Sequence, residues 1–190
     1  DSEGNVWVSN SGVLDPPCPT PSPDDILIDV VGDDGALNLK AAVTLIQPSG
    51  ENRTVTTFKR ALAGPERRGL RLPWGIAVDG NDNVYVANFA GQRLMVLCGV
   101  KEEYCPPGTQ TGDAHGLEQG YPSDALTRNT GVQIDPSGNV WLTNNWIVDA
   151  FTNIGQADSH QNNPGGHAMV VYIGLAAPVK TPMMGPPQRP

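Results

Sequence analysis

Three asparagines stand at the same place in three similar segments of the chain, and together they could hold a ligand. Asn10, Asn88 and Asn144 each end a short run of alternating residues that is typical of a strand. Equivalent strand ends lead into equivalent loops, so the three side chains would face one surface. A structural role is the stronger alternative, because an asparagine at a strand end commonly satisfies turn amides or takes a left-handed conformation.

Two tryptophans at loop ends could stack on a sugar or a peptide. Trp74 precedes the second of these segments, and Trp146 follows Asn144 in the third. An aromatic side chain in such a place can line the mouth of a channel and cover one face of a ligand. Packing between sheets is expected instead for the aromatic residues inside the repeated runs, which are Trp7, Tyr85 and Trp141.

Cys98 and Cys105 flank a turn-like loop that a disulfide could close. Such a bond needs the two Cα atoms within about 7 Å. We expect this disulfide, and the alternative is a buried thiol at a strand end beside an exposed one. Cys18 is left over, either free or paired with a cysteine outside this chain. No C-x-x-C spacing is present, so the cysteines are poor evidence for zinc.

The three histidines, His115, His160 and His167, lie in expected loops or at a strand entry. A general base among them would need a pKa near the working pH and hydrogen-bond reach to a substrate proton. A solvated loop histidine is the simpler interpretation of each. Asp158, Ser159 and His160 offer the residue types of a hydrolase, but adjacency in sequence gives no triad geometry.

The composition narrows the classes of protein to consider. The chain has 190 residues, of which 22 are Gly and 18 are Pro, and 17% are charged. So many helix breakers argue against helical bundles and coiled coils. A net charge of −8 without a cluster of Lys and Arg makes nucleic acid a poor partner. The longest apolar stretch, residues 169 to 179, falls short of the roughly 18 residues of a membrane-spanning helix.

A repeat organises these candidate positions. Three segments align without gaps on the pattern D-x-x-(G/D)-N-V-(W/Y)-(V/L)-small-N, and they are residues 1–10, 79–88 and 135–144. The match continues upstream in the second and third copies, at residues 75–78 and 131–134. The first copy starts at the aspartate that should end a strand.

Each copy predicts a β-hairpin. Its aspartate can accept hydrogen bonds from turn amides, and the fourth position, which is Gly4, Asp82 or Gly138, suits a left-handed residue. The second strand alternates, with aliphatic residues on one face and an aromatic beside a small residue on the other. Both faces are therefore fit for burial between neighbouring sheets.

A third strand is expected after each hairpin, at residues 39–47, 93–98 and 169–173, and residues 54–58 add an outer strand to the first unit. The stretches 11–35, 100–128 and 147–166 are rich in Pro, Gly or polar residues and are expected to be surface loops. The repeat units are approximately 1–62, 63–128 and 129–175, followed by a Pro-rich tail at 176–190.

From Pro73 through Asn88 to Leu94 the chain resembles NHL repeats, in the six-bladed group that includes gluconolactonase-like and streptogramin-lyase-like proteins. The resemblance implies an all-β fold, a β-propeller of four-stranded antiparallel blades, of which this chain covers about three. Three blades cannot close a ring, so we expect about half of a six-bladed propeller. The remainder would come from a separate N-terminal chain, from a segment outside this sequence, or from a two-fold pairing of half-rings.

The resemblance also implies candidate chemistry. In gluconolactonase-like enzymes, carboxylate and Asn oxygens at a central channel hold a divalent cation, which makes Ca²⁺ or Mg²⁺ the candidate cofactor. The candidate ligands here are Asn10, Asn88, Asn144 and Asp149. Streptogramin-lyase-like enzymes use a His general base near Mg²⁺, and His167 is the counterpart by type and placement. The usual NHL unit has Asp where this chain has the three asparagines, so the pattern departs at these ligand positions.

The sequence therefore predicts an NHL-like propeller segment that binds or scaffolds partners through loops on one face of the ring. An acidic, loop-rich chain with an expected disulfide suits an extracytoplasmic location. The candidate partners are the remainder of the propeller and a carbohydrate, peptide or small-molecule ligand, without nucleic acid and without a membrane span. The alternative is a metal-dependent lyase or lactonase at the central channel, so enzymatic activity stays open.

Overall fold

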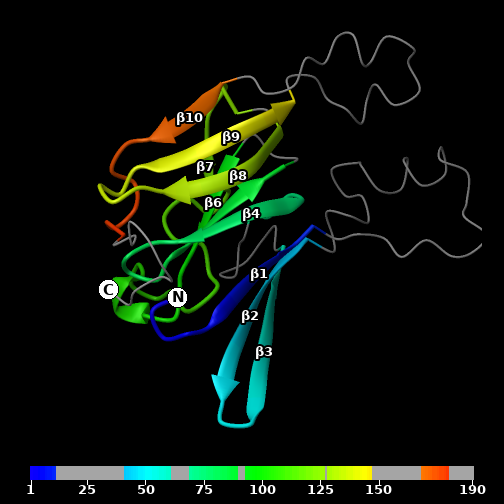
Figure 1. Cartoon of the computed structure of the whole chain (residues 1–190), viewed down its shortest axis with the longest axis vertical. Coiled ribbons are helices and arrows are strands. Elements are labelled where there is room, and N and C mark those ends of the chain that lie inside the picture. Colours follow the sequence, from blue (N-terminus) through cyan, green and yellow to red (C-terminus); the bar gives the residue numbers. More distant parts are fainter. Residues whose placement is uncertain (12–40, 61–68, 90–92, 127, 147–167, 180–190) are drawn as a thin grey trace, which may run out of the picture.

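The repeated hairpins form three antiparallel sheets (Figure 1). A computed structural model describes residues 1–11, 41–60, 69–89, 93–126, 128–146 and 168–179, and this part of the chain is nearly all β. In the first sheet the order is β1 (Val6–Asn10), β2 (Ala42–Ser49) and β3 (Asn52–Lys59). In the second it is β4 (Pro73–Val78), β5 (Val84–Asn88), β6 (Arg93–Leu97) and β7 (Tyr121–Pro122). In the third it is β10 (Met169–Tyr172), β9 (Val140–Trp146) and β8 (Arg128–Ile134).

The all-β prediction is confirmed, and each expected third strand is present within a few residues of its predicted bounds. The one helical element among the described residues is the short 3₁₀ turn η1 (Glu102–Tyr104). In that same part of the chain, no helix has the length and apolar character needed to cross a membrane. The three sheets do not make a closed ring, so the propeller arrangement stays a prediction.

The stretch 100–128 is only partly the surface loop that the sequence predicted. Its end returns to the second sheet as β7, where Tyr121 pairs with Leu94, and Ala114 forms an isolated bridge to Leu97. Leu126 is fully buried. The prediction was wrong here because a few apolar residues, scattered among glycines and polar residues, pack against strands that are distant in sequence.

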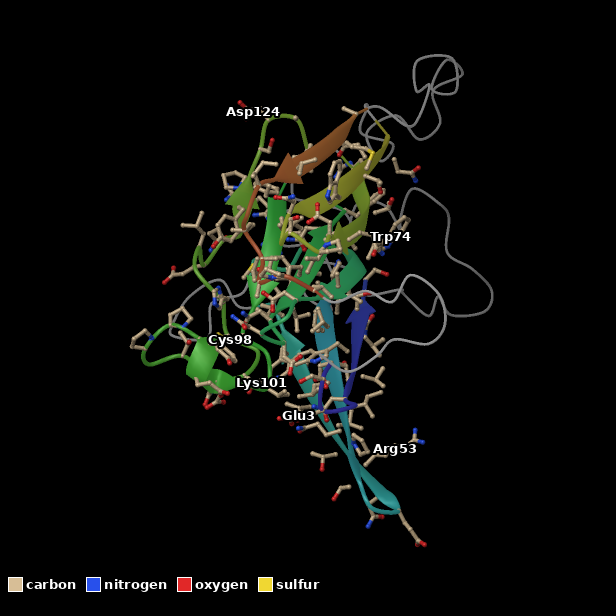
Figure 2. All side chains as sticks on the ribbon, turned by 60° about the vertical axis from the view of Figure 1, so that its left-hand side comes forward. Glu3, Arg53, Trp74, Cys98, Lys101 and Asp124 are labelled. Carbon is tan, nitrogen blue, oxygen red and sulfur yellow. The ribbon has the colours of Figure 1, made fainter. Side chains whose placement is uncertain are left out.

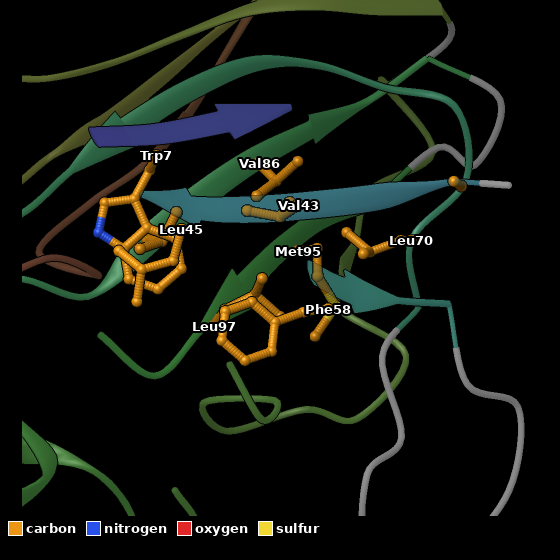
Figure 3. Close-up of a cluster of buried hydrophobic side chains, with 10 residues drawn as sticks. Trp7, Val43, Leu45, Phe58, Leu70, Val86, Met95 and Leu97 are labelled. Atoms are coloured by element: carbon orange, nitrogen blue, oxygen red, sulfur yellow. The ribbon is translucent and has the colours of Figure 1, made fainter. Parts of the chain in front are cut away.

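The sheets stack with the same polarity at both junctions, which means that the aromatic face of one sheet packs on the aliphatic face of the next. The aromatic face of the first sheet packs on the aliphatic face of the second in one buried cluster (Figure 3), whose members include Trp7, Val43, Leu45, Phe58, Val84, Val86, Met95 and Leu97. The aromatic face of the second packs on the aliphatic face of the third in another, whose members include Tyr85, Ala87, Leu94, Val96, Val132, Ile134, Val140 and Leu142. Burial of both faces, which the alternation predicted, is therefore confirmed for the middle sheet.

The strand directions place equivalent ends on the same side of the molecule. β1, β5 and β9 run from their turns toward that side; β1 and β5 end at Asn10 and Asn88, and β9 continues two residues beyond Asn144. β4, β6, β8 and β10 begin on the same side, because each is antiparallel to its neighbour. The hairpin turns, η1 and residues 173–179 lie toward the other side. We call these two sides the asparagine side and the turn side.

Leu142 and Leu117 provide a matched test of this packing. Leu142 is fully buried between the second and third sheets, whereas Leu117 is exposed in the loop before β7. Leu142→Ala should lower the free energy of unfolding by about 2–5 kcal/mol, because it removes buried contacts and leaves a cavity. Leu117→Ala should change it by less than about 0.5 kcal/mol. Urea denaturation of both variants measures the difference, and equal effects would contradict the stacking.

Candidate functional site

The aspartate that begins each repeat organises its turn. In the third copy, one carboxylate oxygen of Asp135 accepts hydrogen bonds from the backbone N–H groups of Ser137 and Asn139, at 2.9 and 3.0 Å. The other oxygen accepts from the side-chain amide of Asn139 and from the indole N–H of Trp141, both at 2.9 Å. One carboxylate thus joins the turn to the aromatic residue of the following strand.

The same arrangement recurs in the other copies. Asp1 accepts from two turn amides, from the Asn5 side chain and from the indole of Trp7. Asp79 accepts from two turn amides at 2.9 Å and from the hydroxyl of Tyr85 at 3.2 Å. The predicted capture of turn amides is confirmed, and the aromatic contact explains why the repeat has Trp or Tyr at this position.

The fourth position of each repeat is left-handed, as predicted. Gly4, Asp82 and Gly138 have φ of 82°, 66° and 81°. Asp82 differs from the glycines because its carboxylate accepts from the backbone and hydroxyl of Ser2, at 3.0 and 2.6 Å, and lies 3.1 Å from the Lys101 ammonium. Burial alone would raise the pKa of Asp82, but these partners outweigh it and hold that pKa below its usual value.

Asn88 and Asn144, at equivalent positions of the second and third repeats, are anchors of the backbone. Asn88 is fully buried; its amide donates to the carbonyl of Gly69 at 2.8 Å, and its oxygen accepts from the N–H of Arg71 at 2.9 Å. The Asn144 amide donates to the carbonyl of Ala125 at 2.7 Å, and both carbonyls lie 19 residues before their asparagine. These residues tie the segment before each inner strand, β4 or β8, to the end of the next strand. Their structural role is therefore observed, whereas Asn10 is exposed at the end of β1.

Asn129 is a buried polar residue that the sequence did not reveal. It has no exposed surface, and its side-chain amide, oriented to satisfy both groups, donates to the carbonyl of Asn88 at 2.6 Å and accepts from the N–H of Asn88 at 3.1 Å. It thereby links the start of β8 to the end of β5, in a different sheet. No local signal marked Asn129, because its partner is distant in sequence.

Trp74 lies at the asparagine side, away from Cys98 and Lys101 (Figure 2). It is 43% exposed, and its ring lies 4.5 Å from that of the buried Phe89. The Arg128 guanidinium carbon lies 5.6 Å from the Phe89 ring centroid, and its Nη1 donates to the Phe89 carbonyl at 3.3 Å. We call Trp74, Phe89 and Arg128 the aromatic platform. An exposed indole backed by a fixed ring is suited to stacking on a planar or apolar ligand surface.

The metal candidates are only partly described. Asp149 and His167 lie outside the described residues, as do Cys18 and His160, and Trp146 ends β9 with a side chain that is not described. In the part of the chain that the structure covers, no three His, Cys, Asp or Glu side chains form a group that could hold a metal ion. His115, which is described, has its Nε2 3.1 Å from the carbonyl oxygen of Tyr104.

Both cysteines of the expected disulfide are free thiols in the structure. Cys98 is buried at the end of β6, with its Sγ 3.4 Å from the Thr109 hydroxyl, and Cys105 is half-buried after η1. Burial raises the pKa of each thiol, so both are protonated at neutral pH. A disulfide between them stays a prediction.

Asp135 gives the turn a measurable pH dependence. Hydrogen bonds from the Trp141 indole and then from Asn139 lower the pKa of Asp135 to about 2. Because this folded-state pKa lies below the usual value of 3.8, the carboxylate stabilises the turn above pH 3.8 and loses that effect as the pH falls toward 2. NMR titration of the carboxyl carbon should give a pKa near 2, with the indole N–H of Trp141 shifting in the same range. A pKa near 3.8 would contradict the hydrogen bonds.

The comparisons with known proteins add no family. No protein-family model matches the chain, and no curated protein matches it. The resemblance to NHL repeats therefore depends on the repeated residues themselves. What the structure adds is that these residues form equivalent turns in three antiparallel sheets.

Proposed function

We propose that this chain is part of an NHL-like β-propeller that binds or scaffolds partners through the loops of its asparagine side. The order of the sheets supports this arrangement, because the aromatic face of one packs on the aliphatic face of the next in both junctions. Repeated units that stack with one polarity are the architecture of propellers and related repeat folds. The rest of the ring comes from the same or another chain.

The observation that carries the binding function is the aromatic platform. Trp74 leaves close to half of its surface open although Phe89 supports it from behind. Its backbone is also fixed, because the Ser9 hydroxyl of the first sheet donates to the Trp74 carbonyl. A rigid aromatic side chain has little conformational entropy to lose on binding, so it is an efficient contact for a carbohydrate or peptide.

The alternative, a metal-dependent lyase or lactonase at the channel, has less support from the described residues. Both polar groups of the Asn88 side chain are engaged by backbone groups, so this residue does not offer a free oxygen to a cation. The enzyme would depend on Asp149 and His167 and on a divalent cation, Ca²⁺ or Mg²⁺. The extracytoplasmic location belongs to the same proposal as the binding function, and the acidic, loop-rich sequence supports it.

Variants of Trp74 test the proposed binding surface. The wild-type chain is first screened on carbohydrate and peptide arrays. Trp74→Ala should then raise the dissociation constant for the captured ligand at least about tenfold, as expected when a central aromatic contact is lost. Trp74→Phe keeps a ring against Phe89 and should retain part of the affinity.

Tyr104→Ala is the control, because Tyr104 is similarly exposed but lies in η1 on the turn side. It should bind as the wild type does. Absence of any captured ligand, or equal binding by Trp74→Ala and the wild type, would refute the platform as the binding surface.

A further inference from the structure

The outer face of the first sheet is aliphatic and uncovered. Val8 is 41% exposed and Val6 more so, whereas Val86 and Val84, at the same repeat positions in the second sheet, are fully buried. The middle of this face is uncharged, with Val6, Val8, Thr44, Ile46, Val55 and Thr57, and the exposed Arg53 and Lys59 of β3 lie on the same face at its two ends. An uncovered, largely aliphatic patch of this kind marks an interaction surface.

The outer face of the third sheet is the complementary one. Trp141 is 37% exposed, whereas Tyr85, its equivalent in the second sheet, is 2% exposed. Thr143 and Met169 beside it are exposed as well. The strand side chains on this face are uncharged, and they are Gln133, Trp141, Thr143, Met169 and Val171; the Asp135 carboxylate lies at its turn end, bonded to the Trp141 indole.

Trp141 is already oriented for packing. Its indole donates to Asp135 just as the indole of Trp7 donates to Asp1, at 2.9 and 3.0 Å. Trp7 is buried, because the aliphatic face of the second sheet covers it. The surface that would cover Trp141 in the same way is an aliphatic sheet face like that of Val6 and Val8.

We propose that a second copy of this chain supplies that face, so that the third sheet of each copy packs on the first sheet of the other. This pairing rests on the proposed propeller arrangement and names the partner that completes it. Each junction would repeat the polarity of the two junctions within the chain. Interfaces that join unlike faces close into rings when the rotation allows it. Two copies give about six blades, within the usual range of about four to eight, whereas three copies would exceed it.

The 190-residue chain tests this pairing directly by native mass spectrometry and light scattering. At a chain concentration of about 100 μM, the wild type should have twice the mass of the 20.1 kDa chain. Val8→Lys and Thr143→Glu each place a charge in both junctions of a symmetric pair, so each variant alone should be monomeric, with a dissociation constant raised at least about tenfold.

Mixing the two variants is the decisive step. The third sheet of Val8→Lys and the first sheet of Thr143→Glu are both intact, so a mixed pair has one native junction and one junction with opposite charges. Mixing should therefore restore the dimer. Leu117→Lys and Leu117→Glu are the controls, because Leu117 is exposed but belongs to neither face, and both should stay dimeric. Circular dichroism and thermal unfolding establish that every variant is folded.

A monomeric wild type, open-ended oligomers, or a dimer that survives both substitutions would overturn the second copy as the partner. If the chain is a monomer, the outer faces of the first and third sheets would instead pack against further sheets of a longer chain or of another protein. The outcome is separable from that of the ligand screen. A monomer that still binds ligand through Trp74 defeats only the pairing, and a dimer that captures no ligand defeats only the binding function.

Discussion

One aspartate in each repeat fixes the geometry on which the rest of the structure depends. Asp135 and its equivalents accept hydrogen bonds from two turn amides and from the aromatic residue two positions into the next strand. The turn and the aromatic face are therefore set by the same carboxylate. Since hydrogen bonds to a carboxylate are stronger than neutral ones, this contact holds the ring on one face while the aliphatic side chains beside it point to the other.

The stacking of sheets follows from that alternation. The turns also bind the segment that passes over them, residues 173–179. The Tyr85 hydroxyl contacts both the Asp79 carboxylate and the carbonyl of Leu175. Residues 173–179 continue across two turns, with the N–H of Ala176 bonded to Gly138 and the N–H of Ala177 bonded to Asp79. A side chain at Gly138 would collide with the carbonyl of Ala176, so this passage requires glycine there.

The sequence predicted those features that depend on neighbours along the chain. The capture of turn amides by aspartate, the left-handed residue at Asp82 and the burial of both faces of β5 all follow from local spacing, and all are confirmed. The bridge of Ala114 to Leu97 and the burial of Leu126 were missed, because their partners are separated from them in sequence by loops without a pattern.

The candidate site was likewise predicted only in part from the sequence. Asn88 does have a structural role, but it bonds Gly69 and Arg71 of the preceding segment and not the turn amides that the sequence suggested. Trp74 was identified from its place at a loop end. Phe89, which supports its ring, was not, because a single aromatic residue after a strand carries no periodic signal.

A double-mutant cycle between Asp79 and Tyr85 tests most directly whether the aspartate sets the aromatic face. The free energies of unfolding of Asp79→Asn, Tyr85→Phe and the double variant are compared with that of the wild type. Because the hydroxyl and the carboxylate lie 3.2 Å apart, we expect a favourable coupling of about 0.5–3 kcal/mol. Strictly additive effects, with a coupling near zero, would contradict it.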